Sequence, residues 1–199
     1  MKIKKMKENL IDKISKNVNF FEKIPKSELH YLIDRSRTIS IKKDACFLEA
    51  GKVPSKIAFV RSGLMRMYYL ENSGKEVTKH FCPEHTLAIS FSAFIQRKPS
   101  LFYIQALEDS KLLIIDHQLY SELLNRHVFW QVTSRKLAEM VFILKEKREA
   151  EFLLDNAQSR YIQFLKDYPN MINRIKQSYI SSYLGIAPES LSRIRANLK

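Results

Sequence analysis

The chain has 199 residues, of which 45% are hydrophobic and 28% are charged, so it can form one large or two small folded domains and is not globally disordered. Its formal net charge of +13 favours polyanionic partners without specifying a fold. It has no run of roughly 18 apolar residues, no secretory signal and only two cysteines, Cys46 and Cys82, which predicts a cytoplasmic protein without a disulfide framework.

Residues 1–36 are predicted to form helices. Apolar residues recur three or four positions apart at Ile3, Met6, Leu10, Ile14 and Val18. A second helix, around Leu29, Leu32 and Ile33, is expected to have Pro25 as its first residue. The basic face of the first helix could lie on a membrane, but a solvated face is the simpler interpretation, and we expect no membrane partner.

Residues 37–116 are rich in β-branched and aromatic residues and are divided by turn signals such as Ser62-Gly63 and Asn72-Ser73-Gly74. This pattern of short strand-forming segments separated by turns predicts an antiparallel roll or sandwich. The candidate strands are Thr38–Ile41, Ala45–Leu48, Ile57–Val60, Leu64–Leu70, Val77–Phe81, Thr86–Ile89, Phe102–Leu107 and Leu112–Ile115.

Residues 117–154 are predicted to be helical, with a short helix over 117–125 and a long one from about Val128 to Leu153. The long helix would span about 37 Å, more than one small roll can cover. We expect its apolar stripe to meet a second copy in a parallel dimer; the alternative is a helix packed wholly within its own monomer. The predicted stripe consists of Val132, Leu137, Met140, Val141 and Leu144.

Residues 155–199 are predicted to form a separate DNA-binding domain. Asp155 or Asn156 can cap a helix that runs to Tyr168. A further helix is expected over Gln177–Leu184, with Ile180 and Leu184 inward and Ser181 small where another helix approaches. Gly185 can end this helix in the left-handed conformation, Ile186 can fill the turn and Pro188 can begin the next helix. This order of residues is typical of a helix-turn-helix.

The last helix divides into two faces. At about 100° per residue, Leu191, Ile194 and Leu198 share one face, whereas Glu189, Ser192 and Arg193 share the other. Arg193 can bind guanine, Glu189 can accept from cytosine N4, and Ser192 can touch a base edge or a thymine methyl group. Candidates for contacts with DNA phosphates are Arg174, Lys176, Gln177, Ser178, Ser190 and Arg195. The competing interpretation makes Glu189 and Arg193 an ordinary ion pair along an exposed helix.

With these residues, the chain resembles the Crp/Fnr family of bacterial transcription regulators, in a short form like those of Bacteroidetes. The segment Glu189-Ser190-Leu191-Ser192-Arg193 looks like the E-x-x-S-R pattern of the Fnr branch, and Ser62–Arg66, Pro99-Ser100 and Ala106–Ser110 resemble segments of the family's roll. The resemblance implies a homodimer that reads a two-fold symmetric double-stranded DNA site with TGA half-site cores and contacts RNA polymerase. The expected fold is α+β: N-terminal helices on an antiparallel β roll (jelly roll), a long dimerisation helix and a C-terminal helix-turn-helix.

The sequence departs from the family at three places. Cyclic-nucleotide binders carry Gly-Glu and Arg-Ser where this chain aligns Ile89-Ser90 and Pro99-Ser100, so we do not expect cyclic AMP to bind. The iron-sulfur sensor of the Fnr branch needs four cysteines, so no cofactor is expected. The sequence given ends at Lys199, just after the last helix, which predicts a reduced wing, and Ala187 is a poor N-cap.

Two other classes of protein share features with this sequence. A cupin-like metalloenzyme would need a metal site at His80, Cys82, Glu84 and His85, but Pro83 interrupts the strand and the cupin pattern is absent, so we expect neither an enzyme nor a metal. A sensor for an unidentified small molecule would use a pocket lined by Ser90, Ser92 and Ser100, with the hinge near residues 154–156 transmitting the signal. The aromatic residues nearby are more typical of a core than of a ligand cage.

Overall fold

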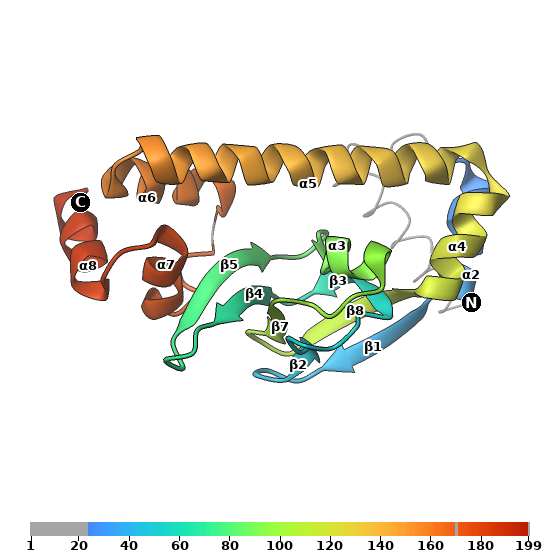
Figure 1. The fold of residues 1–199 in the computed structure, drawn as a ribbon, viewed down its shortest axis with the longest axis horizontal. Helices are drawn as coiled ribbons and strands as arrows, with labels where there is room; N and C mark the ends of the chain where they lie inside the picture. The colour runs from blue at the N-terminus through green and yellow to red at the C-terminus, as the bar shows by residue number, and fades with distance from the viewer. Residues whose placement is uncertain (1–23, 170, 199) are drawn as a thin grey trace. The chain divides into compact units, whose positions relative to one another are not determined.

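A computed structural model describes residues 24–169 and 171–198 (Figure 1). The predicted helix over residues 3–18 lies outside this range. The helices of the described part are α2 (Lys26–Arg35), α3 (Phe91–Gln96), α4 (His117–Arg126), α5 (Val128–Leu154), α6 (Ala157–Asp167), α7 (Gln177–Leu184) and α8 (Pro188–Asn197). The strands are β1 (Arg37–Ile41), β2 (Cys46–Leu48), β3 (Lys56–Ser62), β4 (Met65–Leu70), β5 (Glu76–Cys82), β6 (Leu87–Ala88), β7 (Tyr103–Ala106) and β8 (Ser110–Asp116). The α+β class is confirmed, with antiparallel sheets followed by a long helix and further helices.

The eight predicted strands all form, and they make two four-stranded sheets with the orders β1-β8-β3-β6 and β2-β7-β4-β5. In the first sheet, β8 pairs antiparallel with both β1 and β3. The strands send alternate apolar side chains into a common core that includes Val60, Met65, Ile104 and Leu112, none of which is more than 2% exposed. Burial of these side chains makes the main favourable contribution to the folding free energy of the roll.

Helices α2 and α4 cover one side of the roll. Leu29 and Leu32 of α2 pack with Phe59, Leu119 and Leu123 in a second apolar cluster. This arrangement confirms the predicted helix around Leu29. Pro25, however, is the N-cap of α2 and not its first helical residue, because its ψ of 132° is extended.

A buried carboxylate fixes α2 to the helices that follow the roll. Glu28 is 5% exposed and accepts hydrogen bonds from Nε of Arg126 and from Nε1 of Trp130, at 3.1 and 3.0 Å to Oε2. Burial alone would raise the pKa of Glu28, but the hydrogen bonds from Trp130 and Arg126 outweigh it and lower the pKa below its usual value. The carboxylate therefore stays ionised inside the apolar cluster.

Two features differ from the sequence prediction. Helix α3 was not predicted, because its six residues are too few to show helical periodicity. Leu198 follows the end of α8 and is 42% exposed, so it does not extend the apolar face of that helix.

The described residues group into two compact units. One contains the residues up to Met67 together with Phe81–Leu137, and the other contains Tyr68–His80 together with the residues from Ala138 onward. The second unit therefore combines the outer part of the β4–β5 hairpin with the C-terminal part of α5 and the helices that follow it. No helix in the described part of the chain is long and apolar enough to cross a membrane.

Candidate nucleic-acid interface

Helices α7 and α8 form the predicted helix-turn-helix. Gly185 ends α7 with a φ of 67°, and the N–H of Ile186 donates to the carbonyl of Ser181 at 3.0 Å, as in a left-handed helix cap. Pro188 then begins α8, and Ala187 provides no side-chain cap, as its residue type predicts.

The inner faces of α7 and α8 lie in an apolar core. Ile180, Leu184 and Leu191 are at most 1% exposed, and the small Ser181 is 2% exposed where the two helices meet. Aromatic rings complete this core, with Tyr183 lying 5.6 Å from Phe164 between ring centroids. The core fixes the position of α8 relative to the rest of the small domain.

The three predicted base readers lie on the opposite face. Glu189, Ser192 and Arg193 are all exposed, whereas Leu191 between them is buried. Among the described residues, no ion pair joins Glu189 to Arg193, so the alternative of an ordinary intrahelical pair is not seen. Both charged groups are available to a partner.

The predicted phosphate ligands differ in exposure. Lys176 and Ser178 are exposed at the start of α7, whereas Arg174, Ser190 and Arg195 are half-buried. Gln177 is half-buried as well, and its Nε2 donates to Oγ of Ser192 at 2.7 Å. The structure thus brings one predicted phosphate ligand into direct contact with one predicted base reader.

Two arginines that sequence reasoning missed hold the C-terminal end of α7. Arg148 of α5 donates to the carbonyl of Tyr183, and Arg160 of α6 donates to the carbonyl of Leu184 at 3.1 Å. The Arg148 guanidinium also stacks 3.8 Å from the centroid of the Tyr183 ring. Cations are favourable at a helix C-terminus, where carbonyls lack partners within the helix.

The β4–β5 hairpin packs on the same helix. The N–H of Thr78 donates to Oγ of Ser182 at 2.9 Å, and that hydroxyl donates to the carbonyl of Glu76 at 3.0 Å. The hydroxyl of Tyr168 is hydrogen-bonded to Nδ1 of His80 at 2.9 Å. Because β5 is an edge strand of its sheet, Ser182 satisfies backbone groups that no other strand of the described residues covers.

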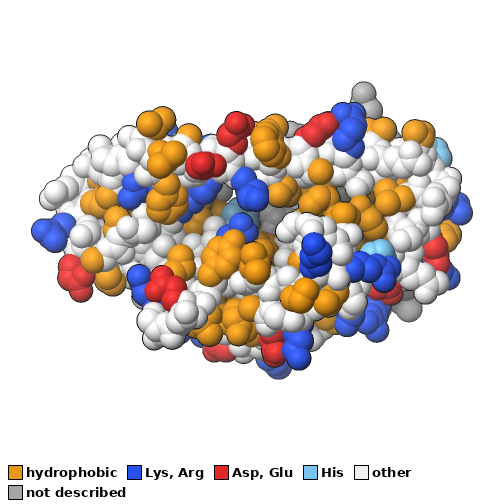
Figure 2. Space-filling model, viewed as in Figure 1, with side chains coloured by type: hydrophobic (Ala, Val, Ile, Leu, Met, Phe, Trp, Pro, Cys, Tyr) orange, Lys and Arg blue, Asp and Glu red, His pale blue; other side chains and the backbone are white. Residues whose placement is uncertain are grey.

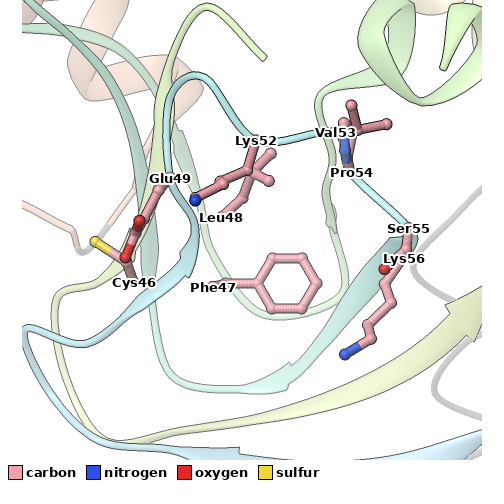
Figure 3. A pocket seen from close by; sticks show the side chains of 9 residues that line it. All are labelled: Cys46, Phe47, Leu48, Glu49, Lys52, Val53, Pro54, Ser55 and Lys56. Atoms are coloured by element: carbon pink, nitrogen blue, oxygen red, sulfur yellow. The ribbon is translucent and has the colours of Figure 1, made fainter. Parts of the chain in front are cut away.

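The predicted effector residues differ in exposure. Ser90 and Ser100 are each 2% exposed, their hydroxyl oxygens lie 3.0 Å apart, and the Ser100 hydroxyl also bonds the carbonyl of Phe102, whereas Ser92 is exposed on α3. A pocket of about 260 Å³ lies elsewhere in the roll, with the Phe47 ring in the middle of its lining side chains (Figure 3). Its lining residues are Cys46, Phe47, Leu48, Glu49, Lys52, Val53, Pro54, Ser55 and Lys56.

The residues considered for a metal site are separated by other interactions. Strand β5 ends at Cys82, directly before Pro83, and Glu84 accepts a hydrogen bond from the N–H of Gly63 at 3.0 Å. His80 faces Tyr168. Within residues 24–169 and 171–198, no three His, Cys, Asp or Glu side chains are grouped closely enough to hold a metal ion.

Helix α5 is apolar on two faces. Leu137, Met140 and Val141 are half-buried, but Val132 lies about 140° around the helix from Leu137, so the five residues of the predicted stripe do not share one face. The uncovered face carries Val128, Val132, Phe142, Ile143 and Leu153, and Phe142 is 65% exposed. Figure 2 shows hydrophobic side chains reaching the surface at several places along this helix.

Comparisons with known proteins agree with this architecture. Residues 38–127 match the model of the cyclic nucleotide-binding domain family. Among solved structures, FixK2 from Bradyrhizobium japonicum is 19% identical, with a TM-score of 0.68 over 82% of this chain and 84% of that one. A Crp/Fnr-family regulator from Eubacterium rectale is 17% identical, with a TM-score of 0.66 over 90% of this chain and 85% of its own. The catabolite activator protein of Thermus thermophilus is 17% identical, with a TM-score of 0.54 over 91% of this chain and 86% of its own.

No curated protein matches the sequence. The chain nevertheless contains a domain of the cyclic nucleotide-binding type. Over most of its length it has the fold of Crp/Fnr transcription regulators, as the resemblance implied.

Proposed function

We propose that the chain is a sequence-specific DNA-binding transcription regulator of the Crp/Fnr type and not an enzyme. The observation that carries this proposal is the division of α8, which buries Leu191 and exposes Glu189, Ser192 and Arg193. A recognition helix needs this division, because one face packs on its domain while the other enters the major groove. The net charge of +13 supports association with DNA. A contact with RNA polymerase is proposed from the family resemblance alone.

The readers are assigned by their chemistry. Arg193 binds guanine O6 and N7, Glu189 accepts from cytosine N4, and Ser192 contacts a neighbouring base. Lys176 and Ser178 are the exposed candidates for phosphate contacts at the start of α7, where N–H groups without helical partners favour an anion.

The regulator acts as a homodimer through the uncovered apolar face of α5. Phe142 and Ile143 are 65% and 60% exposed, and a second copy of the helix would remove them from water. Phe142→Glu should convert the dimer into a monomer in sedimentation equilibrium. Leu101→Glu is the matched control, since Leu101 is an equally apolar side chain, 80% exposed in the roll, and its replacement should leave the dimer intact.

Cyclic AMP is not the proposed effector. Ser90 and Ser100, at the positions aligned with the nucleotide ligands, are buried against each other and supply no positive charge for a phosphate. A different small molecule that binds the roll and controls DNA binding is the second candidate function, favoured by the match to the cyclic nucleotide-binding domain. Titration calorimetry with cyclic AMP should show no heat, and micromolar binding would contradict this part.

Selection of bound sites from random duplexes tests the proposal. We expect an inverted repeat whose half-site centres lie one helical turn apart, about 34 to 36 Å, because a two-fold dimer places its recognition helices at that spacing. Affinity should also fall by about 0.9 log unit per log unit of salt for each phosphate contacted, and Lys176→Ala should reduce that slope by about one such contact. A protein that retains all duplexes equally would contradict the proposal.

A further inference from the structure

The hydroxyl of Ser192 has two partners within the described residues. It donates to the carbonyl of Pro188, one turn earlier in α8, at 3.1 Å. It accepts from Nε2 of Gln177, the first residue of α7, at 2.7 Å. The base-reading helix and the helix before it are therefore joined by a side-chain hydrogen bond at the exposed face.

These partners fix what Ser192 can offer to DNA. A serine hydroxyl has one proton and two lone pairs. The proton is used by Pro188 and one lone pair by Gln177, so a single lone pair remains on an exposed oxygen. In this state Ser192 can accept a further hydrogen bond from DNA but has no proton left to donate to it.

An acceptor distinguishes bases in the major groove. Guanine O6 and N7 and thymine O4 are acceptors there, whereas cytosine N4 and adenine N6 carry amino groups that donate. Ser192 held as an acceptor favours an amino group and disfavours the other two bases. If Gln177 were absent, the hydroxyl could rotate and also donate, and this discrimination would weaken.

We propose that Gln177 is a specificity-determining residue of the DNA site, which holds Ser192 as a hydrogen-bond acceptor for an exocyclic amino group of adenine or cytosine. This inference rests on the proposed function, and it differs from the expectation that Gln177 binds a phosphate. Gln177 acts through Ser192, so it is a positioning residue and not itself a base reader.

The test compares sites selected from random duplexes by the wild-type protein, Ser192→Ala and Gln177→Ala. Both variants should lose about threefold to tenfold in preference at the same base-pair position of each half-site and keep the preferences set by Arg193. The double variant should lose no more than Ser192→Ala alone, because the two residues act as one unit. Gln177→Met, which keeps the length of the side chain but cannot donate, should reproduce Gln177→Ala if the alanine variant folds poorly.

A base analogue identifies the group that is read. At the position found above, purine in place of adenine, or 2-pyrimidinone in place of cytosine, removes the amino group. The wild-type protein should lose the same threefold to tenfold in affinity, and both single variants should be indifferent to the replacement.

Ser178→Ala is the control for the loss of a phosphate contact, because Ser178 is exposed beside Gln177 and its side chain forms no hydrogen bond with the described residues of α8. It should weaken binding to all duplexes alike. If Gln177→Ala does the same, or changes a position other than the one changed by Ser192→Ala, the inference is wrong while the proposed function stands. A wild-type protein without sequence preference would overturn the proposed function itself and this inference with it.

Discussion

Polar side chains are used differently in the β roll and in the α7–α8 pair. In the roll, Ser90 and Ser100 are buried and hydrogen-bonded to each other. In the helix pair, Glu189 and Arg193 are exposed and form no ion pair with each other. Buried polar groups that form hydrogen bonds with each other stabilise a fold. Exposed polar groups on a rigid helix that form no ion pair with each other can bind a partner. The helix pair is therefore the better supported functional site.

The two regions also differ in how tightly their glycines are packed. A Cβ on Gly63 of the roll would lie 2.7 Å from Cα of Ser110, and the φ of Gly63 is +101°. Gly63→Ala should lower the free energy of unfolding by about 2 to 5 kcal/mol, from backbone strain and overpacking together. Denaturant unfolding measures this loss. Gly74→Ala, with a φ of +82° and no atom within 4 Å, should lose only the strain part, and equal losses would show that the packing does not matter.

In the helix pair the corresponding substitution should be milder. A Cβ on Gly185 would lie 2.6 Å from Cε1 of Phe152, but that ring is 45% exposed and can move. Gly185→Ala should lower the free energy of unfolding by about 1 to 2 kcal/mol, chiefly from the left-handed backbone. The same denaturation experiment checks it. A loss as large as that of Gly63→Ala would mean that the turn of the helix pair is as rigid as the roll.

The hydrogen bonds of Ser182 predict a smaller effect. Ser182→Ala removes the hydrogen-bond partner of the Thr78 N–H and of the Glu76 carbonyl. It should lower the free energy of unfolding by about 1 kcal/mol. Hydrogen exchange at the Thr78 amide should become faster in this variant and stay unchanged in Ser178→Ala, which alters an exposed serine of the same helix. A Thr78 amide that already exchanges freely in the wild-type protein would show that the hairpin and α7 do not pack together in solution.

At neutral pH, substitution of His80 is expected to have the smallest effect on stability. Burial, with the nearby charges of Lys79 and Arg148, lowers the pKa of His80 to about 4 from 6.5. The neutral imidazole is therefore favoured in the fold, and its stabilisation is fully present above pH 6.5 and is lost as the pH falls toward 4. His80→Gln should reduce this acid sensitivity in thermal unfolding, whereas His30→Gln, which replaces an exposed histidine, should not. Identical pH profiles for the wild-type protein and His80→Gln would contradict the assignment.

Local patterns in the sequence were sufficient to find the strands and the helix-turn-helix. Most of the strands are runs that contain β-branched or aromatic residues between turn residues, and Gly185 and Pro188 mark the turn between α7 and α8 within four residues. These signals depend on neighbours along the chain, so one sequence contains them.

Contacts between distant segments could not be predicted in the same way. Ser182 bonds the carbonyl of Glu76 across 106 positions of sequence, and Arg148 bonds that of Tyr183 across 35. Nothing in the residue types near either partner indicates such a pairing. On α5, Val132 lies on a different face from Leu137, Met140, Val141 and Leu144, and because this helix is apolar on two faces its sequence does not reveal which of them a second copy would cover.

The most direct test measures the affinity of the wild-type protein and of Arg193→Ala for the selected duplex and for a scrambled duplex at one salt concentration. We predict that the ratio of the two affinities falls by about 5- to 150-fold in the variant, because the guanine contact is lost while phosphate contacts persist. An equal loss of affinity for both duplexes would contradict it, since Arg193 would then touch only the DNA backbone.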